Sequence, residues 1–228
     1  MQLTWYGHAT LGIQDSSGKV IITDPHNPET SGYKPYDTPA DLVLMSSAVD
    51  DFHNNGHLIP GNPEVINTLD IATAGDGDTG SRTVQHVDVS AITVMEVHNH
   101  PTHDPEQNAM YRFEVDGISV GHTGDAGNPL TEDQLEFFRD VDVLLALAGG
   151  YPTLAMPDLK VLIDHAKPKL VVPMHFRTIR YKPRNSFWIT EFLQLFNDDD
   201  VDFACDSTVT LTKDALPAST RALVLDYV

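Results

Sequence analysis

The chain has 228 residues, 41% of them hydrophobic, which is enough to bury a core as one large domain or two small ones. Its 33 acidic and 14 basic residues give a net charge of −19, which argues against binding nucleic acid or an anionic membrane through a broad basic surface. The single cysteine, Cys205, excludes an internal disulfide framework.

The sequence shows no pattern typical of a targeting signal. The first residues, MQLTWYGHAT, show no basic region followed by an apolar run, so we expect no signal peptide. No apolar segment approaches the roughly 18 residues that a bilayer-spanning helix needs. Together with the lone cysteine, which fits a reducing compartment, this predicts a cytoplasmic protein with no membrane partner.

The first half of the chain is predicted to be rich in strands. Short apolar or alternating runs, separated by turn residues such as Asp15-Ser16-Ser17-Gly18, predict the strands. Pro, Gly and Asn mark the segments 26–38 and 74–80 as loops. The expected strands are residues 1–6, 11–14, 19–23, 40–45, 83–87 and 90–97, with a further short element near 65–69.

In the second half, strands and helices alternate. Asp116-Gly117 is a two-residue hairpin signal, and Thr131 is a helix N-cap followed by acidic residues. The order of strands and helices predicts two mixed sheets with helices packed outside. The expected strands are 109–115, 118–120, 141–148, 170–173 and 209–211 with Phe203, and the expected helices are 132–139, 157–166 and 188–196.

Potential metal ligands stand where predicted strands end. Histidines 98, 100 and 103 follow the run from Ala91 to Val97, and Asp125 lies in the glycine-bounded segment GHTGDAG. His175 follows the buried strand at 170–173, and Asp50 to His53 follow the strand at 40–45. Strand ends are where sheet proteins present their sites, so this placement predicts a metal site.

Several of these segments resemble the metallo-β-lactamase superfamily, and most closely its small cytoplasmic metal-dependent hydrolases related to ascorbate-6-phosphate lactonases. The resemblance covers most of the chain and is most specific in GHTGDAG and KPKLVVPMHF. It implies one domain over residues 1–228, folded as a four-layer αβ/βα sandwich of two mixed β-sheets with helices on the outer faces. The other matching segments are TWYGHAT, ITDP, DLVLMS and VDVLL with Gly149-Gly150.

The resemblance also implies roles for individual residues. His98, Asp125 and His175 match metal ligands of the family, and Asp51 and His53 are the candidate catalytic residues. Side chains that position the ligands or contact substrate are expected among His8, Asp24, His100, His103 and His122.

The chain departs from the family at its His-x-His-x-Asp-His motif. Counted from the preceding strand, Ser47, Val49 and Phe52 replace the three histidines and Asp51 is kept. Counted from His53 instead, Ala48, Asp50 and Phe52 occupy the other motif positions. At least two ligands are lost in either register, so a two-metal site is not expected.

Two functions follow from these observations. The first is a metal-dependent hydrolase with a reduced, mononuclear site that binds one divalent ion (Zn, Mn or Fe) and acts on a small-molecule lactone, ester or phosphoester. A carboxylate ligand from Asp50 or Asp51 would move metal preference from Zn²⁺ toward Mn²⁺ or Fe²⁺. The alternative is a non-catalytic protein that has lost its metal and binds a ligand or partner, as an aromatic Phe52 at a ligand position suggests. The oligomeric state is left open.

Overall fold

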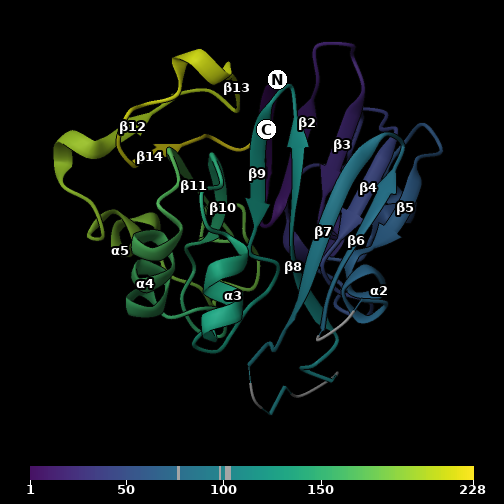
Figure 1. Cartoon of the computed structure of the whole chain (residues 1–228), viewed down its shortest axis with the longest axis horizontal. Coiled ribbons are helices and arrows are strands. Elements are labelled where there is room, and N and C mark those ends of the chain that lie inside the picture. Colours follow the sequence, from purple (N-terminus) through teal and green to yellow (C-terminus); the bar gives the residue numbers. More distant parts are fainter. Residues whose placement is uncertain (76–77, 98, 101–103) are drawn as a thin grey trace.

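Two mixed β-sheets face each other in the computed structural model, which describes residues 1–75, 78–97, 99–100 and 104–228 (Figure 1). The first sheet has the order β13-β1-β2-β3-β4-β5 and the second the order β12-β14-β11-β10-β9-β8-β7-β6. This arrangement confirms the sandwich of two mixed sheets. The strands of the first sheet are β1 (Gln2–Gly7), β2 (Thr10–Gln14), β3 (Val20–Thr23), β4 (Leu42–Met45), β5 (Glu64–Asn67) and β13 (Thr208–Thr210).

The second sheet is larger and supplies most of the core. Its strands β9, β10, β11 and β14 run parallel to one another, whereas β6 to β9 form an antiparallel meander. Its strands are β6 (Thr79–Val84), β7 (Val87–Val94), β8 (Asn108–Val115), β9 (Ile118–His122), β10 (Val143–Leu147), β11 (Leu170–Met174), β12 (Val201–Phe203) and β14 (Arg221–Val224).

The helices are short. Figure 1 shows α3, α4 and α5 beside the second sheet, on the side away from the first. The predicted cap at Thr131 is present as a capping box, in which the Thr131 hydroxyl accepts from the Gln134 backbone N–H and the Gln134 side chain accepts from the Thr131 N–H. The helices are α1 (Pro28–Ser31), α2 (Thr68–Thr73), α3 (Glu132–Phe137), α4 (Met156–Ala166) and α5 (Ile189–Leu193), with 3₁₀ turns at Gly56–Leu58, Asp198–Asp200 and Lys213–Ala215.

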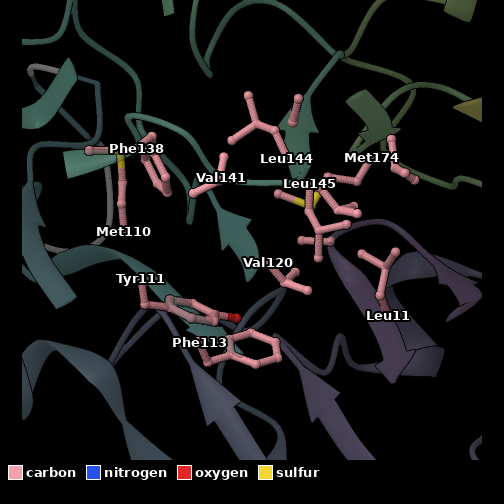
Figure 2. Close-up of a cluster of buried hydrophobic side chains, with 14 of the residues drawn as sticks. Leu11, Met110, Tyr111, Phe113, Val120, Phe138, Val141, Leu144, Leu145 and Met174 are labelled. Atoms are coloured by element: carbon pink, nitrogen blue, oxygen red, sulfur yellow. The ribbon is translucent and has the colours of Figure 1, made fainter. Parts of the chain in front are cut away.

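The main core lies between the sheets. Leu11 of β2 belongs to the same buried cluster as Val120 of β9 and Leu145 of β10, and these side chains are drawn in Figure 2. A second, smaller cluster contains Ile22 of β3 and Val43 of β4. Among the described residues, no helix has the length and apolar character needed to span a bilayer.

Strand direction brings several strand ends to one edge of the sandwich. In the first sheet β1, β3 and β4 point the same way, because β2 is antiparallel to both β1 and β3 while β3 and β4 are parallel. In the second sheet β7, β9, β10 and β11 also share one direction. Residues that follow these strands can therefore meet between the sheets.

Candidate metal centre

Acidic and imidazole side chains converge between the two sheets, each placed there by the end of a strand. His8 follows β1, Asp24 follows β3, and His175 follows β11. All three have positive φ angles, of 50°, 39° and 63°, so the chain turns sharply as each strand stops. The backbone N–H of His175 donates to the carbonyl of His8 at 2.9 Å, which joins the sheets at this point. The other members are Asp50 and His53 after β4, and Asp125 after β9.

Asp24 fixes the orientation of His53. Its carboxylate, fully buried, lies 2.8 Å from His53 Nδ1 and accepts from the Ser46 backbone N–H at 2.7 Å and the Tyr111 hydroxyl at 3.1 Å. With Nδ1 engaged, His53 Nε2 points to Asp125 Oδ2 at 3.5 Å. A carboxylate behind a histidine in this way sets the ring orientation and leaves the second nitrogen available as a ligand.

The charges around His53 are strongly coupled to it. Burial alone would lower the pKa of His53, but Asp125, Asp24 and Asp50 outweigh this effect and raise the pKa to about 10. Burial would likewise raise the pKa of Asp24, yet His122 and the hydrogen bonds from His53 and Ser46 hold it below its ordinary value. In the metal-free protein, His53 and Asp24 thus form a buried ion pair.

His8 and His175 form the other side of the cluster. Their ring centroids are 3.8 Å apart, and His175 Nε2 lies 3.4 Å from Asp125 Oδ1. Burial, together with repulsion from His53, lowers the pKa of His175 to about 3, and burial with His175 and His53 as neighbours lowers the pKa of His8. Both rings are therefore neutral near pH 7, which is the form that binds metals.

Asp125 lies between these imidazoles and a second carboxylate. Burial, with Glu96 and Asp50 nearby, raises the pKa of Asp125, and burial with Asp50 nearby raises the pKa of Glu96 to about 7. Two adjacent buried carboxyl groups cannot both ionise readily, so they hold a proton in the absence of a cation.

Unpartnered buried atoms show that this cluster fits a metal ion. His8 Nδ1, His53 Nε2, His175 Nδ1 and Asp125 Oδ1 are all buried and have no hydrogen-bond partner among the described residues. Such atoms are rare in native proteins and need an explanation. His8, His53 and His175 can each offer one ligand atom within 4.8 Å of the others, and so can Asp50, His53 and Asp125. Imidazole and carboxylate donors of this kind suit a divalent transition metal.

The cluster opens into a cavity of about 300 Å³. Phe52 forms part of its wall, with its ring centroid 5.1 Å from that of His8, and Tyr181 closes another side with its hydroxyl 3.4 Å from His8 Nε2. The remaining lining residues are Val49, Asp50, Asp51, Glu96, His100, Asp125, Pro152, Thr153, His175, Pro183 and Asn185.

The structure gathers most, but not all, of the residues expected from the sequence. His53, Asp125 and His175 are together as described above, with His8 and Asp24 beside them. The predicted ligand His98 and the neighbouring His103 lie outside the described residues.

Asp51, the other candidate catalytic residue, has hydrogen-bond partners outside the cluster. Its carboxylate accepts from Asn27 Nδ2 at 3.2 Å and from Thr30 Oγ1 at 2.9 Å, so both oxygens have partners outside the buried cluster although the residue lines the cavity. This geometry does not support Asp51 as a catalytic residue. Asp50 and His53 point inward instead, which is the arrangement expected when the degenerate motif is counted from His53.

The two remaining predicted histidines differ in exposure. His122 is fully buried: its Nε2 lies 3.2 Å from the Ala9 carbonyl, and its Nδ1 accepts from the Gly124 N–H, so it supports the fold behind the site and cannot touch substrate. His100 lines the cavity, with its Nε2 3.5 Å from Glu96 Oε1.

Sequence reasoning missed Glu96 and Tyr181. Glu96 was hidden because the predicted strand ran to Val97, whereas β7 ends at Val94 and leaves Glu96 at a strand end like the other site residues. Tyr181 lies in an irregular segment and carries no sequence signal for its place in the cavity.

Comparison with known proteins identifies the family of this chain. The family model for the β-lactamase superfamily domain matches residues 2–175. This chain belongs to the metallo-β-lactamase superfamily.

Relatives within the superfamily match along most of the chain. A protein of Archaeoglobus fulgidus named UPF0173 metal-dependent hydrolase is 27% identical over 199 residues, covering 78% of this chain and 84% of the relative. One of Thermococcus kodakarensis with the same family name is 26% identical, covering 78% and 85%. A crystal structure from Thermotoga maritima, described as a candidate Zn-dependent hydrolase of the superfamily, is 30% identical with a TM-score of 0.75, covering 100% of this chain and 99% of that one.

Proposed function

We propose that this protein is a metal-dependent hydrolase with one divalent ion held among His8, Asp50, His53, Asp125 and His175. The observation that carries the proposal is the convergence of buried, unpartnered ring nitrogens and a carboxylate oxygen on one cavity. Superfamily membership and relatives named metal-dependent hydrolases support it.

A single ion is favoured because His53 is shared. It belongs to both potential ligand groups, and its Nδ1 is engaged by Asp24, so Nε2 alone can serve as ligand. When bound, a divalent ion supplies Lewis acidity that makes water a stronger nucleophile near neutral pH and polarises the bond to be cleaved. Zn²⁺, Mn²⁺ and Fe²⁺ are the candidates, and the carboxylates of Asp50 and Asp125 favour the latter two.

The charges of the cavity wall limit the class of substrate that can bind. Its described lining residues include Asp50, Glu96 and Asp125 but no lysine or arginine. A phosphoester placed here would meet these carboxylates with the bound divalent ion, and no cationic side chain of the described lining, to offset its charge. Among the three substrate classes that the family resemblance suggests, an uncharged scissile group, as in a carboxylic ester or lactone, therefore fits best. The kinship to ascorbate-6-phosphate lactonases remains a prediction.

The test is hydrolysis by metal-stripped protein reloaded separately with Zn²⁺, Mn²⁺ or Fe²⁺. Phenyl acetate, a γ-lactone and bis(4-nitrophenyl) phosphate serve as substrates, with His53→Ala as the inactive control. We expect metal-dependent cleavage of the ester or lactone that His53→Ala abolishes. Absence of cleavage with every metal, together with absence of metal binding, would instead support a ligand-binding protein whose metal space has been lost around Phe52.

A further inference from the structure

Part of the cavity that contains the metal cluster is apolar. Phe52 and Tyr181 contribute two aromatic rings to its lining, with centroids 6.2 Å apart in an edge-to-face arrangement. Val49 and Pro183, which are close to these residues in the chain, also line the cavity. We refer to Val49, Phe52, Tyr181 and Pro183 as the apolar wall. A bound molecule would therefore meet apolar side chains as well as carboxylates and imidazoles.

The apolar wall borders the proposed metal ligands. The ring centroid of His8 lies 5.1 Å from that of Phe52 and 5.3 Å from that of Tyr181. On its other side, the His8 ring lies 3.8 Å from the ring of His175. A substituent only a few bonds long on a scissile group at this centre would therefore touch Phe52 or Tyr181.

Hydrogen bonds within the loop after β4 hold Phe52 in this position. Ser47 Oγ accepts from the backbone N–H groups of Val49 and Asp50, at 3.2 Å and 3.1 Å. Asp50 Oδ1 in turn accepts from the Phe52 N–H at 2.8 Å. Since Asp50 is also a potential metal ligand, the same loop positions a ligand and the apolar wall. Both are in place before a substrate arrives, which lowers the cost of binding it.

Among the described residues, two members of the apolar wall keep exposed surface. Phe52 is half-buried, and Val49 is 42% exposed. In the motif register counted from His53, Phe52 also stands where the family has its aspartate. An aromatic ring at this place offers a ligand neither a charge nor a donor atom. It offers surface that an apolar group covers more favourably than water does.

We propose that the apolar wall binds a small, uncharged acyl group of the substrate, and that Phe52 and Val49 determine which acyl groups are accepted. This inference rests on the proposed hydrolase function. With the ester or lactone carbonyl at the metal centre, the acyl carbons would lie on Phe52 and Tyr181. A cavity of about 300 Å³ is at the lower end of the range for small-molecule sites, so the acyl group is a small one.

The first test compares matched esters on the metal-loaded protein. 4-Nitrophenyl butyrate adds two methylene groups to 4-nitrophenyl acetate, and 4-nitrophenyl methoxyacetate replaces one of them with oxygen at nearly the same length. Because these esters differ in intrinsic reactivity, each kcat/KM is divided by the ester's rate constant for hydrolysis by hydroxide. We expect the normalised value for butyrate to exceed both others by about tenfold, since each methylene group removed from water contributes about fourfold.

Variants assign this preference to the apolar wall. Phe52→Leu keeps an apolar side chain and should keep most of the preference for butyrate, whereas Phe52→Asn, with a polar side chain of similar size, should lower it to about twofold or less. Both variants retain the backbone N–H that binds Asp50, and their metal content is measured alongside. Phe203→Asn, the same substitution at a 59% exposed position on β12, is the matched control and should keep the preference.

Two results would overturn the proposal: equal normalised kcat/KM for butyrate and methoxyacetate in the parent protein, or an equal preference in Phe52→Leu and Phe52→Asn. Should Phe52→Asn fail to fold, Val49→Thr provides the same comparison with a nearly isosteric change at an exposed position. Val49→Thr should lower the preference for butyrate about twofold, and an unchanged preference would again contradict the proposal.

A second test does not depend on hydrolysis. Cyclohexanecarboxamide and oxane-4-carboxamide have the same shape and differ by one ring methylene group replaced with oxygen. Calorimetric titration should show the first binding about fourfold or more tightly than the second, and Phe52→Asn should remove the difference. If no ester is cleaved but this difference is found, the hydrolase proposal fails and the apolar wall stands as a binding site. Equal affinities, or no binding of either amide, would refute the site itself.

Discussion

Asp24 is the residue on which the proposed centre depends most, although it offers no ligand atom itself. Its carboxylate accepts from the Ser46 backbone and lies 2.8 Å from His53 Nδ1, so it determines which ring nitrogen of His53 faces the cavity. Loss of such a supporting carboxylate commonly weakens metal binding by ten- to a hundredfold.

We therefore predict that Asp24→Asn lowers metal affinity by about ten- to a hundredfold. Asp51→Asn is the matched control: it changes a carboxylate in the same region, but one that is turned to Asn27 and Thr30. Titration with Zn²⁺ or Mn²⁺ by calorimetry measures both affinities. A larger loss in Asp51→Asn than in Asp24→Asn would mean that the motif register counted from β4 is correct.

A second residue-scale prediction concerns His26, which lies behind the site between Ser31 Oγ and the Tyr6 carbonyl. Burial, only partly offset by backbone hydrogen bonds, lowers its pKa from 6.5 to about 4. As pH falls, the unfolded chain therefore binds the proton first, so stability is complete above pH 6.5 and is lost progressively toward pH 4.

The substitution His26→Gln should remove this loss of stability at low pH. Between pH 7 and pH 4 the parent protein should lose roughly 3 kcal/mol more of its unfolding free energy than the variant, as a pKa difference of this size implies. Urea unfolding at several pH values measures the slope. His57→Gln, the same substitution at an exposed position, is measured alongside as the comparison variant. Parallel slopes for the parent and His26→Gln would show that His26 is not the group concerned.

At the scale of elements, the turn after β9 determines where Asp125 lies. Gly124 has a φ of +58°, and a Cβ there would come within 2.2 Å of the Ala109 carbonyl oxygen in β8. Any other residue must push β8 and the turn apart. Gly117, in the β8–β9 hairpin, has a φ of +76°, and a Cβ built there would have no atom within 4 Å. A side chain at Gly117 would therefore be disfavoured by the positive φ alone and would meet no steric clash.

Gly124→Ala should therefore destabilise the protein by roughly 3 kcal/mol and reduce metal binding, because strain and a steric clash act together. Gly117→Ala should cost about 1 kcal/mol and leave metal binding intact. Thermal unfolding and metal titration provide the two measurements. Equal destabilisation in the two variants would show that the contact between the new Cβ and the Ala109 carbonyl oxygen does not lower the stability.

Elements with clear local signals could be predicted from the sequence. The helix N-cap at Thr131 and the Asp116-Gly117 hairpin, with φ values of 52° and 76°, are where the residues indicate. Asp125 and His175 follow the parallel strands β9 and β11, whose shared direction brings both residues to one edge of the sheet.

Other features depend on contacts that no local pattern encodes. The direction of the loop after β4, which gives the Asp51 carboxylate partners outside the cluster and turns His53 inward, is set by Asn27, Thr30 and Asp24, all distant in sequence. Strand β14 was not predicted, since its short run of mixed residues is stabilised by parallel pairing with β11 and β12.

For the whole molecule, the shared core predicts cooperative unfolding. Side chains of both sheets, including Leu3 and Leu11 of the first and Val89 and Leu145 of the second, form one buried cluster. Residues near the two ends of the chain also pair, with the Val228 N–H donating to the Trp5 carbonyl. Neither sheet buries its inner face without the other.

We accordingly predict one domain over residues 1–228 and a single unfolding transition. Far-ultraviolet circular dichroism and the fluorescence of the buried Trp5 should give coincident denaturation curves. Two separated transitions, or limited proteolysis that yields two stable fragments, would show that the sheets fold independently.

The central claim is that the buried cluster around His53 is a metal site, and the most direct measurement is metal content per chain. Elemental analysis should be made on protein purified without added metal, alongside His53→Ala, which removes the residue shared by both ligand groups. We predict about one divalent transition metal ion per chain in the parent protein and a large loss in the variant. A metal-free parent protein that also gains no thermal stability when Zn²⁺, Mn²⁺ or Fe²⁺ is added would contradict the claim.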